Sequence, residues 1–368
     1  MSAKPKDLLA YRDIVSRIRI EHDQYALILN ELKVAYDDVG YTAAPVCKLI
    51  TGESRTGKSC VVTDMLEIYL PCQSGNQILR SVVYAVAPAE ATVKSLLESL
   101  LKGLGDPYWS RGTVSSMTQR LYTLLDAVQC RLIILDEFQH LCDKGQQIKL
   151  DKLADWLKVL IESRKYGLIA VGLPIAESIV HKHPQLRGRF DETLRMPLFD
   201  WQDKASCAQF RGILRQFEKA LQPFQLPSLD SRDMGLRFYL ASAGRIGLIT
   251  KLLDRAVAEA IRAHTTNIRL EDLARAYERV IWSASHFPVP GGPFGASLES
   301  LSQRGLQDTV IAQAALEEVA DHSALVQVHG QKDPPAAGDP IGKTKPRVRS
   351  VRKKSSRLDV ERELGRAF

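Results

Sequence analysis

The chain has 368 residues, of which 45% are hydrophobic, so it is long enough for a substantial core and more than one domain. Its formal net charge is +7, but residues 331–368 alone hold eleven Lys or Arg against five acidic residues. The basic character therefore belongs to a C-terminal tail and does not predict a basic globular surface.

Nothing in the sequence predicts export or membrane insertion. Lys4, Lys6 and Arg12 stand among few apolar residues near the N-terminus, and no 18 apolar residues run together. The six cysteines form no C-x-x-C pair, which favours reduced thiols. We expect a cytoplasmic protein without a membrane partner.

The first 200 residues predict an N-terminal helical segment (1–44) and then an α/β fold, in which helices cover a parallel sheet over residues 45–200. The predicted strands are 46–50, 81–87, 131–135, 167–171 and 193–199, and the predicted helices are 58–70, 90–102, 114–128 and 150–164. His181 and His183 flank Pro184 without a second ligand pair, so we expect them to be loop residues.

The remaining chain is predicted to be helical and then irregular. Residues 201–285 predict a small helical lid, with helices at 203–221, 230–242, 246–263 and 270–284. A Pro- and Gly-rich linker and a weak helix at about 305–327 are expected within residues 286–330. The basic tail, 331–368, is expected to be flexible and disordered in isolation.

Residues 52–59 have the sequence GESRTGKS and stand between a predicted strand and a predicted helix. This G-x-x-x-x-G-K-[ST] run in that context is a P-loop, whose backbone N–H groups surround phosphates. Lys58 would reach the β and γ phosphates, and the Ser59 hydroxyl would ligate Mg²⁺. The sequence therefore predicts ATP and Mg²⁺ as cofactors. The predicted nucleotide contacts are Gly52, Glu53, Ser54, Arg55, Thr56, Gly57, Lys58, Ser59 and Cys60.

A second nucleotide motif follows at residues 131–137, with the sequence RLIILDE. Its apolar residues predict a buried parallel strand whose carboxyl end presents two acids to the ligand crevice. Asp136 would hold Mg²⁺, directly or through water, and Glu137 would polarise the attacking water, because a carboxylate committed to the metal is a poor base. Lys58, Glu137 and one arginine are the predicted catalytic residues.

That arginine is predicted just before the last strand, in the sequence QLRGRF at residues 185–190. Arg189, with Arg187 as the alternate, could reach the γ-phosphate held by a neighbouring subunit. In the helical lid, Arg245 stands in an A-G-R-I-G run at the start of a helix, from where it could touch the nucleotide. A surface arginine pair and a plain helix N-terminus are the alternatives.

Together these motifs resemble the AAA+ ATPase pattern. More narrowly, LDEFQHL at residues 135–141 resembles the D-E-x-Q-H-L signature of the TniB/TnsC transposition ATPases of Tn7-like or CRISPR-associated transposons. Leu186-x-x-Arg189-Phe190 and the segment from Ala87 to Pro107 are also similar to that family. The resemblance covers about residues 45–255.

The resemblance implies an ATP-dependent, DNA-binding regulator of transposition. Such proteins oligomerise as rings or helical filaments on duplex DNA, as a hexamer or as a heptamer per turn. They link a target-selection protein of the TniQ type to a transposase, and ATP hydrolysis disassembles the filament. The sequence departs from the family where the strand at 167–171 ends in Gly172-Leu173-Pro174 instead of a polar sensor side chain, so we expect slow or partner-dependent hydrolysis.

DNA contacts are predicted in the segments after the second strand of the sheet, at Lys94, Lys102, Arg111 and Thr113. Ordinary solvated helix polarity is the competing interpretation of each. The basic tail could bind DNA or dock on a transposase. Two other functions remain open, namely a signalling or defence ATPase that acts on a protein without DNA, and a nucleotide-gated scaffold that hardly hydrolyses ATP.

Overall fold

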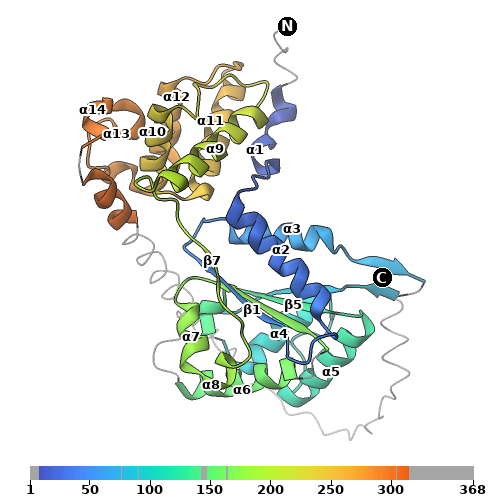
Figure 1. The fold of residues 1–368 in the computed structure, drawn as a ribbon. Helices are drawn as coiled ribbons and strands as arrows, with labels where there is room; N and C mark the ends of the chain where they lie inside the picture. Colours follow the sequence, from blue (N-terminus) through green and yellow to red (C-terminus); the bar gives the residue numbers. More distant parts are fainter. Residues whose placement is uncertain are drawn as a thin grey trace, which may run out of the picture.

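The computed structural model describes residues 8–314 except 76, 90, 142–146, 163–164 and 304. The chain forms a sheet region and a helical region, joined by the segment after the last strand of the sheet (Figure 1). The basic tail and the part of the predicted weak helix beyond residue 314 lie outside the described residues, whereas residues 306–314 are helical.

The sheet has five parallel strands in the order β4-β5-β6-β1-β7. Their bounds are β1 Cys47–Gly52, β4 Val82–Val86, β5 Leu132–Asp136, β6 Gly167–Gly172 and β7 Leu194–Met196. Each prediction of a sheet strand is confirmed to within a few residues. Because β1 lies between β6 and β7, it is an interior strand, and its carboxyl end lies next to the ends of its neighbours.

Helices cover both faces of this sheet. One face packs against α2 (Asp23–Asp38) and α3 (Lys58–Ile68). The other face packs against α4 (Val93–Leu104), α5 (Val114–Ala127) and α6 (Gln147–Glu162). The buried strands are apolar on both sides because both sides are covered.

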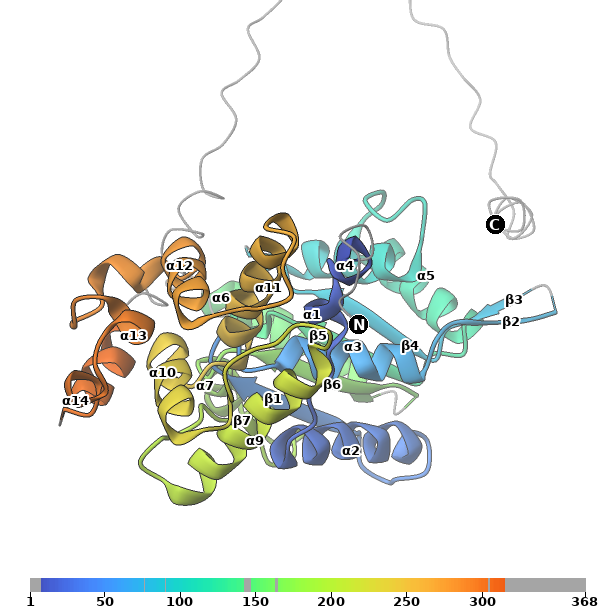
Figure 2. The same cartoon turned by 90° about the horizontal axis from the view of Figure 1, so that it is seen from above.

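Two features of the sheet region were not predicted. The β2–β3 hairpin, Cys72–Ser74 and Gln77–Leu79, projects from the body of the protein (Figure 2). The helices α7 (Ala176–Lys182) and α8 (Pro184–Arg187) lie between β6 and β7. The prediction that His181 is a loop residue is therefore wrong, because His181 belongs to α7. His183 is the single non-helical residue between α7 and α8, and it is buried.

The helical region is built from α9 (Lys204–Ala220), α10 (Arg232–Ser242), α11 (Ile246–Arg262) and α12 (Leu270–Val280), with the short η3 (Trp282–His286), α13 (Gly292–Gly295) and α14 (Leu298–Leu301). Most of their apolar faces form one large core, and α10 and α14 share a second, smaller cluster with residues 306–314. The first helices of the chain, η1 (Leu8–Tyr11) and α1 (Ile14–Arg17), contribute Leu8 and Val15 to this core. The N-terminal segment thus packs on both regions, since α2 packs on the sheet.

Within the part of the chain that the structure describes, no helix has the length and the apolar character needed to cross a bilayer.

Candidate nucleotide site

The P-loop connects the carboxyl end of β1 to the N-terminus of α3. Gly57 caps α3 with a φ of 110°, a left-handed conformation that favours glycine. Within the described part of the chain, the backbone N–H groups of Thr56 and Gly57 donate to no protein acceptor. Ser59 and Cys60 follow in the first turn of α3. The loop therefore offers N–H donors and a helix N-terminus to an anion, which suits a polyphosphate.

Lys58 lies across this loop. Its ammonium group donates to the carbonyl oxygens of Gly52 at 2.6 Å and Glu53 at 2.7 Å. Its charge also lowers the pKa of Asp136, so the two side chains are near enough to interact. In the sequence, β4 and most of β5 lie between Lys58 and Asp136. Because the strands are parallel, both residues lie at the carboxyl ends of the strands.

Asp136 ends β5 and is buried. It accepts hydrogen bonds from the Tyr84 hydroxyl at 3.0 Å and from the Glu137 backbone N–H at 2.8 Å. Burial is the largest cause that raises the pKa of Asp136, and these hydrogen bonds oppose it. A buried carboxylate at this place would be stabilised by a divalent cation.

The residues present fit Mg²⁺ bound together with a nucleotide. No cluster of three or more His, Cys, Asp or Glu in the described residues could hold a metal by itself. Mg²⁺ at phosphate sites commonly takes only one or two protein ligands, the others being water and phosphate oxygens. Ser59 and Asp136 would supply such a pair.

Glu137 follows Asp136 with a φ of 56°, at the start of the turn η2 (Phe138–Leu141). Its carboxylate accepts a hydrogen bond from the side-chain amide of Gln139. The same amide accepts one from the Leu173 backbone N–H, just after β6, at 3.0 Å. The ends of β5 and β6 are thus joined by one glutamine side chain.

Arg189 lies near the amino ends of the strands, opposite to the P-loop. The backbone N–H of Asp191 donates to the carbonyl of Cys47, at the start of β1, at 3.1 Å. β1 runs six residues from there to the P-loop, a distance of about 17 Å at the usual rise per residue. Arg189 pairs with Glu162 at 2.6 Å and is too far away to reach the P-loop of its own chain.

Arg245 is buried at the N-terminus of α11, close to the P-loop. Two residues on, the Gly247 N–H donates to the Arg55 carbonyl at 2.9 Å. A Cβ at Gly247 would stand 2.9 Å from the Arg55 Cβ. The helical region therefore touches the P-loop through backbone atoms at a position that has no room for a side chain.

The predicted DNA residues do not all lie together. Lys102, Arg111 and Thr113 cluster around the α4–α5 connection, where Lys102 lies over the Trp109 ring and Arg111 over the Tyr108 ring. Lys94, in the first turn of α4, belongs to the other end of that helix and pairs with Glu98 at 3.8 Å. The Thr113 hydroxyl caps α5.

The α4–α5 connection is braced from beneath. Asp106 is buried and pairs with Arg120 at 2.7 Å. Arg120 also donates to the backbone carbonyls of Tyr108 and Arg111 at 2.9 and 3.0 Å. The aromatic and cationic side chains therefore stand on a fixed backbone.

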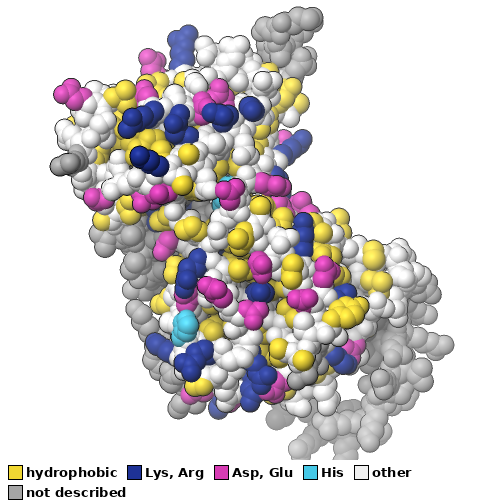
Figure 3. All heavy atoms as spheres, in the orientation of Figure 1, with side chains coloured by type: hydrophobic (Ala, Val, Ile, Leu, Met, Phe, Trp, Pro, Cys, Tyr) yellow, Lys and Arg dark blue, Asp and Glu magenta, His cyan; other side chains and the backbone are white. Residues whose placement is uncertain are grey.

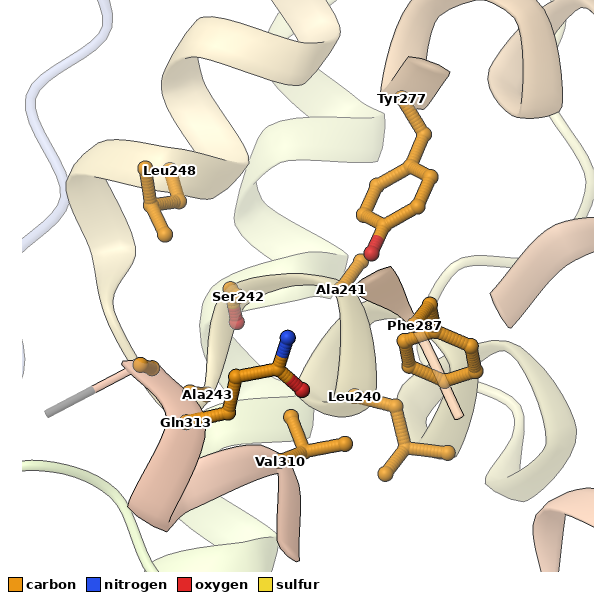
Figure 4. A pocket seen from close by; sticks show the side chains of 10 residues that line it. Leu240, Ala241, Ser242, Ala243, Leu248, Tyr277, Phe287, Val310 and Gln313 are labelled. Atoms are coloured by element: carbon orange, nitrogen blue, oxygen red, sulfur yellow. The ribbon is translucent and has the colours of Figure 1, made fainter. Parts of the chain in front are cut away.

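A small cavity lies away from the P-loop, inside the helical region. It is lined by Leu240, Tyr277 and Phe287, with Val310 and Gln313 from the last described helical turns (Figure 4). Its walls carry few polar groups and no charged side chain. Its lining gives no reason to place the nucleotide there.

The residues that support the site give little signal in the sequence. Tyr84 could have been noticed as the one polar residue in an apolar strand, and Gln139 belonged to a recognised signature without a role of its own. Glu177, which accepts from the Thr51 hydroxyl at 2.7 Å, gave no signal because its helix was not predicted.

Comparison with protein families matches residues 12–203 to the family described as bacterial TniB protein. The match spans more than half of the chain and includes the P-loop, Asp136, Glu137 and Arg189. The comparison with curated protein sequences gave no match.

Several solved structures resemble the chain. The Aeropyrum pernix Orc1 protein, solved in complex with DNA, is 18% identical, with a TM-score of 0.56 over 74% of this chain and 70% of that one. Cdc6p from Pyrobaculum aerophilum is 16% identical, with a TM-score of 0.55 over 76% and 74%. A Walker-type ATPase of Pyrococcus abyssi is 14% identical, with a TM-score of 0.51 over 86% of each chain. These likenesses show the fold, which is that of the AAA+ ATPases.

Proposed function

The chain belongs to the TniB family, and from this premise we propose that it is an ATP-dependent regulator of transposition that assembles on duplex DNA. It is an ATPase of the AAA+ fold. The observation that carries the proposal is the meeting of Lys58, Asp136 and Glu137 at one edge of the sheet, in a chain of this family.

Within one subunit, the proposed roles follow from position. Lys58 would leave the carbonyls of Gly52 and Glu53 and pair with the β and γ phosphates, an exchange of neutral acceptors for charged ones. Ser59 and Asp136 would hold Mg²⁺, which would neutralise charge on the phosphates. Glu137 would accept a proton from the attacking water.

Completion of the site would need a second subunit. Arg189 lies near the amino ends of the strands, away from the P-loop of its own chain, which supports an approach to the nucleotide of a neighbour. There it would stabilise the charge that develops in phosphoryl transfer. The nucleotide would thereby join two subunits in a ring or a helical filament, and its hydrolysis would release them.

Binding to duplex DNA is proposed at the α4–α5 connection. Lys102 and Arg111 would contact phosphates, and their braced backbone means that little ordering is needed on binding. Thr113 and Lys94 are weaker candidates because the Thr113 hydroxyl already caps α5, and Lys94 lies at the other end of α4, where it pairs with an acidic side chain. Lys and Arg side chains also gather on the face of the helical region seen in Figure 3. We further propose that the assembly connects a target-selection protein of the TniQ type to a transposase.

The experiment that tests this function is imaging of the purified full-length protein with duplex DNA, without nucleotide, with ATP and with a non-hydrolysable analogue. Rings or filaments on DNA that require a triphosphate would support the proposal. Discrete particles that ignore DNA would contradict it and would favour a signalling ATPase that acts on a protein.

Two variants sharpen the experiment. Glu137→Gln keeps the phosphate contacts but removes the base, so its assemblies should persist on DNA in ATP. Lys58→Ala removes the main phosphate contact, so it should not assemble. Equal assembly by Lys58→Ala would contradict the role given to the nucleotide.

A further inference from the structure

The carboxyl end of β6 has no polar side chain of its own. The strand ends at Gly172 and is followed by Leu173 and Pro174. This strand lies between β5, which carries Asp136, and β1, which leads into the P-loop. A side chain at its end would therefore face the reacting phosphate from between the two nucleotide motifs.

The side chain of Gln139 occupies this place. Gln139 is only 6% exposed, and a Cβ on Gly172 would stand 2.6 Å from its amide oxygen. A Cβ atom essentially never comes that close to another heavy atom, so any larger residue at 172 would displace the amide. The glycine that removes a polar side chain from β6 is thus what admits one from the turn after β5.

The contacts of the Gln139 amide fix its orientation. Its oxygen accepts from the Leu173 backbone N–H at 3.0 Å, so its NH₂ group must point the other way. That NH₂ group donates to Oε2 of Glu137. A flipped amide would place its oxygen against a carboxylate and its NH₂ group against an N–H group, two repulsive contacts at once.

The turn that carries Gln139 is also anchored. The His140 ring lies 2.9 Å from the Ala87 carbonyl through Nδ1, which must carry the proton because a carbonyl only accepts. Ala87 in turn donates its backbone N–H to the Asp136 carbonyl at 2.8 Å. The turn η2 is therefore tied to β4 and β5, and the Gln139 amide ties it to β6.

We propose that Gln139 is a positioning residue for hydrolysis, which aims Glu137 at the attacking water and takes the place of a polar side chain at the end of β6. By engaging Oε2, it leaves Oε1 of Glu137 to accept the proton. The inference rests on the proposed role of Glu137 as the base. It assigns to Gln139 a contribution to the rate and not to the binding of ATP.

The test uses the full-length protein in steady-state ATP hydrolysis, with Gln139→Met as the main variant because methionine keeps the volume of the buried side chain without its hydrogen bonds. We expect kcat to fall about 10- to 100-fold, less than most of the roughly 10²- to 10⁴-fold that a general base contributes, because Glu137 itself remains, with KM for ATP changed less than about threefold. Gln73→Ala, in the exposed β2–β3 hairpin, is the matched control and should leave both constants unchanged.

Two further variants separate positioning from folding. Gly172→Ala adds no polar atom but displaces the amide, so it should reproduce the kcat loss. Gln139→Ala combined with Gly172→Asn places a polar side chain on β6 in the freed space and should regain several-fold in kcat over Gln139→Ala alone. No gain in the double variant would overturn the claim that Gln139 substitutes for a side chain on β6.

Glu137→Gln in the same assay separates a failure of the role given to Gln139 from a failure of the role given to Glu137. If Glu137→Gln abolishes hydrolysis while Gln139→Met hydrolyses at the wild-type rate, the role of Gln139 is refuted and the proposed function stands. If Glu137→Gln itself keeps the wild-type rate, the proposed base is wrong, and the inference falls with it.

Discussion

The backbone N–H of Gly247 donates to the carbonyl oxygen of Arg55 at 2.9 Å, and this contact joins the first turn of α11 to the middle of the P-loop. Arg55 has a φ of 62°, in the left-handed region that a residue other than glycine rarely adopts. A change in the position of the helical region would therefore be transmitted to the loop that holds the phosphates.

Gly247→Ala should weaken nucleotide binding. The added Cβ would meet the Arg55 Cβ at 2.9 Å and its carbonyl oxygen at 3.1 Å, so the helix or the loop must move. We expect the Kd for ATP to rise about tenfold, equivalent to about 1.4 kcal/mol. Titration with a fluorescent ATP analogue measures this change.

Gly212→Ala is the matched control for this variant. Gly212 also lies in a helix, α9, but a Cβ there has no neighbour within 4 Å. It should leave ATP binding unchanged and raise stability by about 0.5–1 kcal/mol, because alanine favours the helix. Equal ATP affinity in the two variants would contradict the coupling between α11 and the P-loop.

Mixing two inactive variants should restore hydrolysis. Arg189→Ala subunits keep an intact P-loop, and Lys58→Ala subunits keep an intact Arg189. If Arg189 acts on the neighbour, some interfaces in the mixture are complete, and the ATPase rate should exceed that of either variant alone severalfold. The rate is measured on DNA across mixing ratios.

Arg187→Ala serves as the control for Arg189→Ala and should hydrolyse ATP at nearly the wild-type rate. A mixture with no more activity than its components would argue against action in trans. The loss of the Arg189–Glu162 ion pair is not expected to explain the effect, since both partners are partly exposed and such pairs stabilise by about 1 kcal/mol or less.

Removal of the cations at the α4–α5 connection should reduce DNA affinity and its dependence on salt. A phosphate contact contributes close to one unit to the slope of log K against log salt. Lys102→Ala and Arg111→Ala should therefore each lower that slope by about 1, irrespective of DNA sequence. Fluorescence anisotropy at several salt concentrations measures it.

Lys165→Ala is a suitable control because this lysine lies in the segment between α6 and β6, away from the α4–α5 connection, and pairs with Asp126 near the end of α5. It should leave the slope unchanged. If all three variants have the wild-type slope, the α4–α5 connection does not contact DNA phosphates.

Glu177→Gln should destabilise the protein in a pH-dependent way. Arg195 donates to both carboxylate oxygens of Glu177, and the Thr51 hydroxyl donates to one. These hydrogen bonds, that of Arg195 foremost, lower the pKa of Glu177 below its usual value. The carboxylate therefore contributes stability above its unfolded pKa of about 4.3.

That contribution is lost as the pH falls through the lowered pKa of the folded state. We expect Glu177→Gln to cost about 1 kcal/mol near pH 7 and almost nothing at pH values below the folded pKa. Urea denaturation of both proteins from pH 7 to pH 3 measures the difference. A constant difference across this range would mean that the charge of Glu177 is not involved.

The sequence was sufficient for the sheet strands and for the two nucleotide motifs, because buried strands are continuous apolar runs and the P-loop has a fixed spacing. The helices α7 and α8 are too short to show a helical period, so the pattern between β6 and β7 suggested a loop. The strands of the β2–β3 hairpin are largely exposed and only three residues long each, too short to show the alternation that identifies a strand.

Contacts between distant segments were beyond the sequence. Gly172 could be recognised as the absence of a polar side chain, but the arrival of Gln139 from another strand's turn depends on which strands are neighbours. The contact of Gly247 with Arg55 likewise depends on how the helical region sits on the sheet. The sequence was enough to identify these residues, whereas their contact partners could be identified only from the three-dimensional structure.

Arg189 and the P-loop lie at opposite ends of the strands of one sheet, and this arrangement has a consequence for dilute protein. A single subunit would carry both the P-loop and Arg189 but would have no complete site, because the strands hold these two parts apart. The rate of ATP hydrolysis per subunit would then rise with protein concentration until every subunit has a neighbour. DNA would raise the local concentration of subunits, because it binds them side by side along its length.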